Sequence, residues 1–113
     1  MGPKKRGHKT WRFALYITGG TASSASSISS LQQICNSHLG DDYAIEVIDL
    51  LEHPELARQH QILAIPTAIR TFPLPERRVI GNLSIPELVV AYLELPTQQD
   101  QLLSPREGPI SPE

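Results

Sequence analysis

Residues 11–51 constrain the fold more than any other part of the chain. Residues 11–18 alternate apolar side chains with a second set of mixed character, which predicts a central strand covered on both faces. After Gly19-Gly20-Thr21, apolar residues recur every three or four positions, which is the spacing of an amphipathic helix. A second strand is predicted over residues 43–51. Strand, helix and strand in about 40 residues form a βαβ unit, which predicts parallel pairing with a right-handed crossover.

The predicted helix begins in a serine-rich stretch but has clear signals at both ends. Thr21 or Ser23 is the expected N-cap, because a hydroxyl accepts a hydrogen bond from a free amide of the first turn. Gly40 fits the C-terminal end, where the left-handed conformation favours glycine. Serine is a mediocre helix former, so we expect this helix to depend on packing. Its predicted apolar stripe comprises Ala25, Ile28, Leu31, Ile34, Cys35 and Leu39.

The next segment predicts a short helix and a hairpin. Pro54 suits the first position of a helix, where a missing amide costs nothing. Strands over residues 67–72 and 77–81 are expected to pair across the stiff turn Pro73-Leu74-Pro75-Glu76. The inner face of the short helix is expected to comprise Leu56, Ala57, His60 and Leu63.

A last helix is expected to begin at Ser84-Ile85-Pro86-Glu87, which has the pattern of a capping box, and to run to about Leu95. The predicted order is therefore β-α-β-α-β-β-α, in an α/β domain over residues 11–95. Residues 96–113 are rich in Gln, Ser, Pro and Glu, which predicts a disordered tail. Residues 1–10 form a basic arm that we also expect to be disordered.

The composition argues against several classes of protein. Cys35 is the only cysteine, so an intramolecular disulfide, a dithiol redox pair and a four-cysteine zinc site are excluded. The four histidines, His8, His38, His53 and His60, lack a metal-ligand spacing, and we predict no metal and no cofactor.

No apolar run is long enough to cross a membrane, and no signal region follows the basic arm. Aromatic and basic residues do not interleave in a way that indicates nucleic-acid binding. With a net charge of −2, the sequence predicts a cytoplasmic protein with neither a membrane nor a nucleic acid as partner.

The element order and the motif Ile65-Pro66-Thr67 resemble thioredoxin, in which a cis-proline precedes the third strand and faces the active-site loop. Pro66 is the matching position, and a cis X-Pro bond costs only about 0.5–1 kcal/mol relative to trans. The loop that carries the thioredoxin cysteines corresponds to residues 19–24, which contain no thiol. The resemblance therefore implies the thioredoxin-like fold without its dithiol chemistry.

Four segments together resemble the KaiB family in sequence and order, namely residues 15–21, 43–50, 62–67 and 77–84. The resemblance implies a non-catalytic clock or signalling adaptor that binds a KaiC-like ATPase and modulates its phosphorylation or ATPase cycle. A KaiA-like protein or a sensor kinase would be a further partner, and the free state would be a dimer or tetramer. It also implies a second arrangement of the C-terminal half, the KaiB ground state β-α-β-β-α-α-β.

Arg77 and Arg78 beside Pro73 and Pro75 form a rigid, cationic turn. Arginines at a strand end are ordinarily solvated, but the KaiB resemblance implies a contact with a partner. These four residues and Pro66 are the predicted partner-binding residues, and no catalytic residue is predicted.

Gly81 and Asn82 lie in the region that the KaiB family rebuilds between its two folds. Residues 88–93 follow a helical capping signal, but their β-branched and aromatic content also suits a strand.

Four positions depart from the KaiB pattern. Glu52 and Gln61 stand where KaiB proteins carry lysines that contact KaiC, so the identity of the ATPase stays open. Asn82 replaces an aspartate, and Leu74 interrupts a proline triplet. Two alternatives therefore stay open: a KaiB-like stress-response interaction protein uncoupled from timekeeping, and a thiol- or glutathione-linked redox enzyme that would use Cys35 or a serine at 23 or 24.

Overall fold

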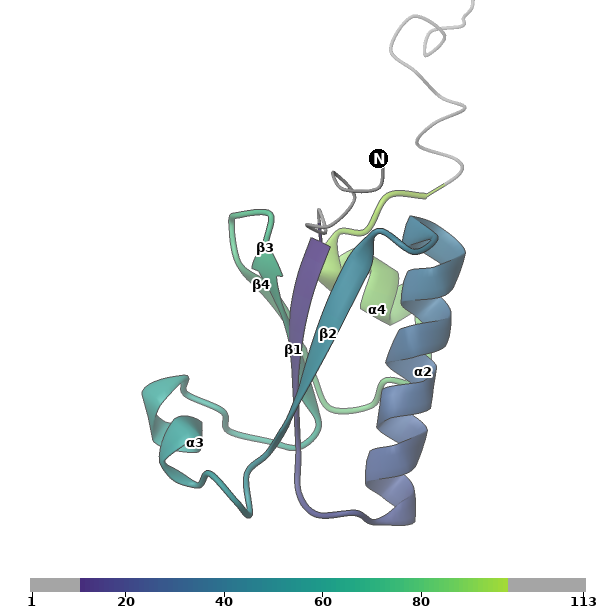
Figure 1. Cartoon of the computed structure of the whole chain (residues 1–113). Coiled ribbons are helices and arrows are strands. Elements are labelled where there is room, and N and C mark those ends of the chain that lie inside the picture. The colour runs from purple at the N-terminus through teal and green to yellow at the C-terminus, as the bar shows by residue number, and fades with distance from the viewer. Residues whose placement is uncertain (1–10, 98–113) are drawn as a thin grey trace, which may run out of the picture.

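The computed structural model describes residues 11–97, which form a four-stranded sheet with helices on both faces (Figure 1). The elements are β1 (Trp11–Ile17), α2 (Ala22–Leu39), β2 (Tyr43–Asp49), α3 (Glu55–Gln59), β3 (Thr67–Phe72), β4 (Arg77–Ile80) and α4 (Pro86–Leu93). The predicted α/β class and the thioredoxin-like order are confirmed. The predicted arm, and the predicted tail beyond Thr97, lie outside the described residues. Within residues 11–97, no helix is long and apolar enough to span a bilayer.

The sheet has the strand order β2-β1-β3-β4, so β1 is central, as its sequence pattern predicted. β1 and β2 pair in parallel in one register from Trp11↔Tyr43 to Ile17↔Asp49, which confirms the βαβ unit. β3 is antiparallel to β1, and β4 returns antiparallel to β3 as the predicted hairpin. Because β1 and β2 are parallel, the loops after them leave the sheet at the same end.

α2 has the ends that the sequence predicted. The Thr21 hydroxyl accepts a hydrogen bond from the Ser24 amide at 3.0 Å, and Gly40 has a positive φ of 65°. The stripe prediction was wrong at Ala25, which is exposed, because the first turns of the helix face the sheet with Ser24 and Ser27. Their hydroxyls donate to the carbonyls of Thr18 and Ser23, both at 3.1 Å. These small polar side chains are therefore buried with their hydrogen bonds made.

Two apolar clusters lie on opposite faces of the sheet. Helices α2 and α4 cover one face of the sheet and α3 lies on the other (Figure 1). The larger cluster includes residues of β1, α2 and α4, and Leu56 and Ala57 of α3 pack against the smaller one. The larger cluster comprises Phe13, Leu15, Ile17, Leu31, Ile34, Cys35, Ala68, Val79, Leu83, Val89, Leu93 and Leu95. The smaller comprises Ala14, Tyr16, Leu50, Ile62 and Ile69.

α3 is shorter than its predicted inner face requires. It spans five residues, and Pro54 is its N-cap rather than its first helical residue. Leu56 and Ala57 pack against the smaller cluster as expected, but the prediction for Leu63 was wrong. Gln61 has a positive φ of 56°, which turns the chain so that Ile62 enters the core and Leu63 is 87% exposed.

The predicted capping box before α4 does not form. The N-cap is Ile85, and it makes no side-chain hydrogen bond to the first turn. The Ser84 amide instead donates to the Asn82 side-chain oxygen at 2.8 Å, in a local turn that competes with capping. α4 ends at Leu93, and Glu94 follows in the left-handed conformation with φ 55°.

Leu31 provides a test of the α2 packing, because its side chain is fully buried in the larger cluster. We expect Leu31→Ala to lower the free energy of unfolding by about 2–5 kcal/mol, since it removes buried apolar atoms and leaves a cavity. Urea denaturation measures this change. Ser29→Ala, at an exposed position of the same helix, is the control and should stay within about 0.5 kcal/mol of wild type. Equal effects of the two substitutions would contradict the described packing.

Candidate partner-binding surface

The Asp49 carboxylate joins the two loops that follow the parallel strands. One of its oxygens accepts hydrogen bonds from the Gly19 amide at 2.8 Å and from the Leu51 amide at 2.9 Å. Gly19 has φ 70°, and a Cβ added there would lie 3.1 Å from a methyl group of Leu51. The positive φ favours glycine here, whereas the methyl group belongs to the exposed Leu51 side chain, which can move aside. The β1–α2 and β2–α3 loops are therefore held together at the end of the sheet.

The two amide hydrogen bonds lower the pKa of the Asp49 carboxyl below its ordinary value of 3.8. The Gly19 amide makes the larger contribution and the Leu51 amide the next. Asp49 is therefore ionised at neutral pH.

A third loop, between α3 and β3, reaches the same end of the molecule. The Ile65–Pro66 peptide bond is cis, as the thioredoxin resemblance predicted. The Thr67 hydroxyl donates to the Ala64 carbonyl at 2.7 Å, and the Gly81 amide donates to the Pro66 carbonyl at 2.7 Å. The loop is thus tied both to its own strand and to the end of β4.

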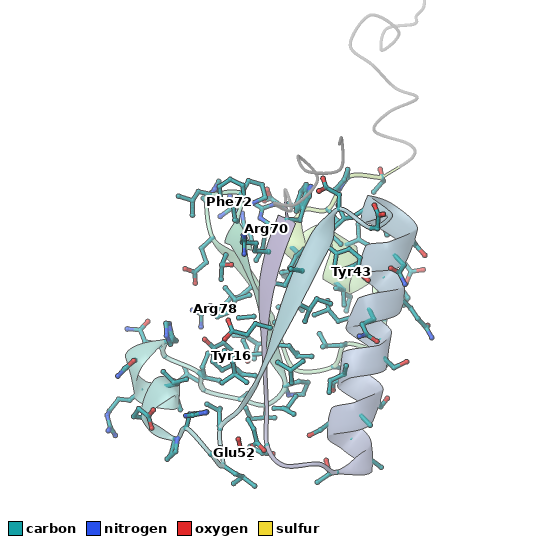
Figure 2. All side chains as sticks on the ribbon, viewed as in Figure 1. Tyr16, Tyr43, Glu52, Arg70, Phe72 and Arg78 are labelled. Carbon is teal, nitrogen blue, oxygen red and sulfur yellow. The ribbon has the colours of Figure 1, made fainter. Side chains whose placement is uncertain are left out.

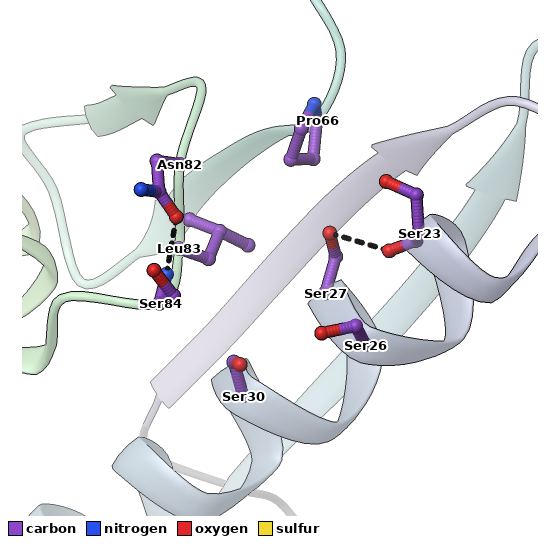
Figure 3. Close-up of a pocket in the computed structure, with 8 residues that line it drawn as sticks. All are labelled: Ser23, Ser26, Ser27, Ser30, Pro66, Asn82, Leu83 and Ser84. Carbon is purple, nitrogen blue, oxygen red and sulfur yellow. Dashed lines mark hydrogen bonds between the residues drawn. The ribbon is translucent and has the colours of Figure 1, made fainter.

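A pocket of about 190 Å³ lies between the first half of α2 and the loop that follows β4 (Figure 3). Hydroxyl groups and one amide supply its polar atoms, and no lining residue is a thiol or a base that could activate a serine. The pocket therefore offers hydrogen bonds but no nucleophile. Its lining residues are Ser23, Ser26, Ser27, Ser30, Pro66, Asn82, Leu83 and Ser84.

Cys35 lies in the core, away from this pocket. Its side chain is buried, and desolvation raises the pKa of the thiol to about 12. The thiol is therefore protonated at neutral pH, whereas thiol chemistry requires the thiolate. Among residues 11–97, no three His, Cys, Asp or Glu side chains are placed to hold a metal ion.

Large apolar side chains are exposed on the loops at this end of the molecule. Leu51 is 70% exposed, Leu63 is 87% exposed, and Ile65 is also exposed. We call these three residues the loop-end surface. Beside it runs a groove of about 400 Å³, lined by Pro54, Ala57, Arg58, Gln61, Ile62 and Leu63. Exposed apolar side chains of this size, carried on loops that hydrogen bonds hold in place, are typical of a protein–protein contact.

The sequence did not reveal the loop-end surface. Leu51 was predicted as the end of a strand and Leu63 as the inner face of a helix. Their exposure follows from β2 ending at Asp49 and from the positive φ of Gln61, and neither has a clear signal in the sequence. Two of the four departures from the KaiB pattern, Glu52 and Gln61, are exposed on the loops at this end, and Figure 2 shows Glu52 there.

The structure does not bring the predicted partner-binding residues together. Pro66 lies at the loop end, where Gly81 and Asn82 are its neighbours. Pro73 and Pro75 lie in the β3–β4 turn, at the opposite end of the sheet, and both follow cis peptide bonds. A partner on one end would therefore contact only part of the predicted set.

Arg77 and Arg78 point to opposite faces of the sheet, because successive side chains of a strand alternate. Arg77 donates to the Glu94 carboxylate after α4 at 2.9 Å. Arg78 lies on the α3 side (Figure 2) and donates to the carbonyls of Gln61 and His60 at 3.1 and 3.2 Å. The two arginines therefore do not form a single cationic patch.

Comparison with known proteins identifies the family of this chain. Residues 14–95 match the family model of the KaiB domain. The chain belongs to the KaiB family. It is 38% identical over 93 residues to the circadian clock protein KaiB3 of Synechocystis sp., covering 82% of this chain and 91% of that protein. It is 41% identical over 87 residues to the circadian clock oscillator protein KaiB of Synechococcus elongatus, covering 77% and 85%.

The fold is shared with thioredoxin-like proteins. The N-terminal domain of Synechococcus elongatus SasA superposes with a TM-score of 0.59 at 11% identity, covering 93% of this chain and 90% of that domain. Mitochondrial thioredoxin 3 from Saccharomyces cerevisiae gives a TM-score of 0.59 at 14% identity, covering 76% and 78%. This KaiB-family chain therefore has the thioredoxin-like arrangement, and the ground-state order β-α-β-β-α-α-β stays a prediction.

Asp49→Asn tests the carboxylate that joins the two loops. A carboxyl whose pKa is lowered on folding stabilises the folded state above its unfolded pKa, and the contribution falls as the pH drops through the folded value. We expect Asp49→Asn to unfold at lower urea concentration than wild type near neutral pH. The difference should shrink below the ordinary value of 3.8.

Urea denaturation near neutral pH and at about pH 3 measures both parts of this expectation. Glu52→Gln is the matched control, since Glu52 is exposed on the same loop. A difference between wild type and Asp49→Asn that is equal at the two pH values would contradict the role of the Asp49 charge.

Proposed function

We propose that this KaiB-family chain is a non-catalytic clock adaptor that binds a KaiC-like ATPase through its loop end. The observation that carries the proposal is the exposure of Leu51 and Leu63 on loops that hydrogen bonds hold in place. Asp49 holds the loop of Leu51, and the hydrogen bonds from Thr67 to Ala64 and from Gly81 to Pro66 hold the loop of Leu63. Apolar side chains presented on held loops lose little conformational freedom on binding, which favours association. Family membership supports the clock role and the kind of partner.

Binding would change the phosphorylation or ATPase cycle of the partner only through a difference in affinity between states of the ATPase. A ligand shifts an equilibrium by no more than its differential affinity for the two states. The adaptor would therefore bind one nucleotide or phosphorylation state of the ring more tightly than the others. This role requires no catalytic group, which agrees with the buried Cys35 thiol and with the pocket that lacks a base.

Further clock proteins are proposed as partners. The fold shared with the N-terminal domain of SasA supports a sensor kinase among them, and a KaiA-like protein follows from the KaiB resemblance alone. That the free protein is a dimer or tetramer also stays a prediction. Gel filtration of the isolated protein measures its oligomeric state.

A second candidate is a KaiB-like interaction protein of the stress response. Glu52 and Gln61 favour it, because they border the loop-end surface where the family pattern has lysines. An acidic and a neutral side chain would match a different partner surface. The redox alternative has no comparable support, because no described thiol or base is placed for it.

The first experiment is gel filtration of the protein with the KaiC homologue of the same organism, in ATP and in ADP. A complex in one nucleotide state supports the adaptor. No complex in either state, across a range of temperatures, would contradict it and favour the stress-response candidate. Reduction of a disulfide substrate that depends on Cys35 would instead support the redox enzyme.

Leu63→Ser tests which end of the molecule binds. We expect it to weaken the complex by about tenfold or more, because it removes a central apolar contact. Stability should stay within about 0.5 kcal/mol of wild type, since Leu63 is 87% exposed. Binding is measured by fluorescence anisotropy and stability by urea denaturation.

Leu74→Ser is the matched control, because Leu74 is 73% exposed at the opposite end of the sheet, between Pro73 and Pro75. Unchanged binding of Leu74→Ser supports the loop end. Weaker binding of Leu74→Ser with unchanged binding of Leu63→Ser would assign the contact to the β3–β4 turn. The predicted residues Pro73, Pro75, Arg77 and Arg78 would then form the contact.

A further inference from the structure

The helix α4 is apolar on two sides. Val89 and Leu93 are fully buried in the larger cluster. Ile85, Leu88 and Tyr92 are between 41% and 56% exposed, and their spacing of three and four positions places them on one side of the helix. We call these three residues the α4 stripe. A helix with apolar residues all round is typical of a buried helix, so the exposed stripe indicates a surface that another molecule covers.

The C-terminal end of α4 is fixed by a buried arginine of β3. Arg70 is 4% exposed, and its guanidinium donates to the Leu93 carbonyl at 2.9 Å and to the Glu94 carbonyl at 3.3 Å. The carbonyls at the end of a helix have no partner within the helix, and a cation suits the negative end of the helix dipole. The α4 stripe is therefore presented on a helix that is already held, which lowers the entropy lost on association.

The helices on this face of the sheet carry almost no charge. The 18 residues of α2 contain no Asp, Glu, Lys or Arg, and the eight residues of α4 contain only Glu87. Both helices cover the same face of the sheet (Figure 1). The centres of protein–protein interfaces are likewise depleted of charged side chains. The matching partner surface is apolar and uncharged, and a second copy of this chain presents such a surface.

The spacing of the α4 stripe is also complementary to itself. Leu88 lies between Ile85 and Tyr92, about one helical turn from each. In a pair of antiparallel helices related by a two-fold axis, each contact between two residues occurs twice. An axis beside Leu88 brings Leu88 of one copy against Leu88 of the other. The same axis places the Tyr92 ring of each copy over Ile85 of the other, with the hydroxyl free to stay in water at the rim.

The area of the α4 stripe indicates how strong this contact can be. An interface of standard size buries about 800 Å² on each partner. Three half-exposed apolar side chains offer on the order of 300 Å², which is the size of the largest apolar patch on a typical monomer. The association is therefore weak and depends on the protein concentration.

We propose that two copies of this chain associate through their α4 stripes, as a two-fold pair of antiparallel α4 helices. The KaiB resemblance implies an oligomer but does not name this surface. The inference concerns the thioredoxin-like arrangement and does not depend on the proposed ATPase partner. Because α3 lies on the other face of the sheet (Figure 1), each pair would leave both loop-end surfaces uncovered.

Cysteine cross-linking of the full chain tests the position of the axis. Leu88→Cys places two thiols on facing helices about 8–10 Å apart, which brings their Cα atoms within the range of about 4.4–6.8 Å that a disulfide needs. Cys35 is fully buried and does not compete. We expect mild oxidation to link Leu88→Cys into a dimer. Leu63→Cys, on the loop-end surface, is the matched control and should give at least about tenfold less linked dimer, because its thiols meet only by collision.

Sedimentation velocity measures the association without a cross-link. The wild-type protein should shift from monomer to dimer between roughly 10 µM and 1 mM, the range that a small interface implies. Leu88→Lys should raise the concentration at the midpoint by about tenfold or more, because two like charges would meet at the axis. Leu63→Lys is the control and should leave the midpoint unchanged.

Two results would overturn the proposal. One is a wild-type protein that stays monomeric at every concentration. The other is an oligomer that Leu88→Lys leaves intact and that Leu88→Cys does not link, because the contact would then lie on another surface. If Leu88→Lys does not fold, Tyr92→Ser decides in the same way: a higher midpoint supports the α4 pair, and an unchanged midpoint refutes it.

Discussion

β1 lies between β2 and β3, and its residues 13–17 are buried on both faces. Phe13, Leu15 and Ile17 face the larger cluster, whereas Ala14 and Tyr16 face the smaller one. Every helix of the described chain therefore packs against a layer that β1 supports. The parallel pairing with β2 then fixes where the loops emerge, and so where a partner can reach the molecule. The candidate surface is a consequence of this one doubly covered strand.

The helices and strands could be predicted from periodic patterns in the sequence. Individual side-chain hydrogen bonds could be predicted less well. The βαβ unit, the caps of α2 and the hairpin follow from spacing and from Thr21 and Gly40, which act locally. The capping box at Ser84 failed because the Asn82 side chain satisfies the Ser84 amide first. Arg70 was missed because an arginine in a strand is ordinarily exposed. Its acceptors are backbone carbonyls, which have no signature in a sequence.

The candidate site shows a thioredoxin-like scaffold without the groups that thiol chemistry needs. The loop after β1 and the cis-proline loop meet beside a pocket lined by hydroxyls and an amide. The one cysteine is in the core with its pKa raised. What the scaffold does present is apolar surface on held loops, which suits association better than catalysis. Membership of the KaiB family agrees with that reading of the chemistry.

Because the side chains of Arg77 and Arg78 alternate, β4 contacts segments on both faces of the sheet. Arg77 contacts Glu94, the residue after α4, and Arg78 contacts the carbonyl of Gln61 after α3, so this four-residue strand is hydrogen-bonded to segments on both faces of the sheet. Two identical neighbours cannot define the alignment of the strand, since a slip by one position would leave an arginine on each side. The alignment of β4 therefore depends on the buried Val79, which pairs with Ala68, and on the β3–β4 turn that joins the two strands.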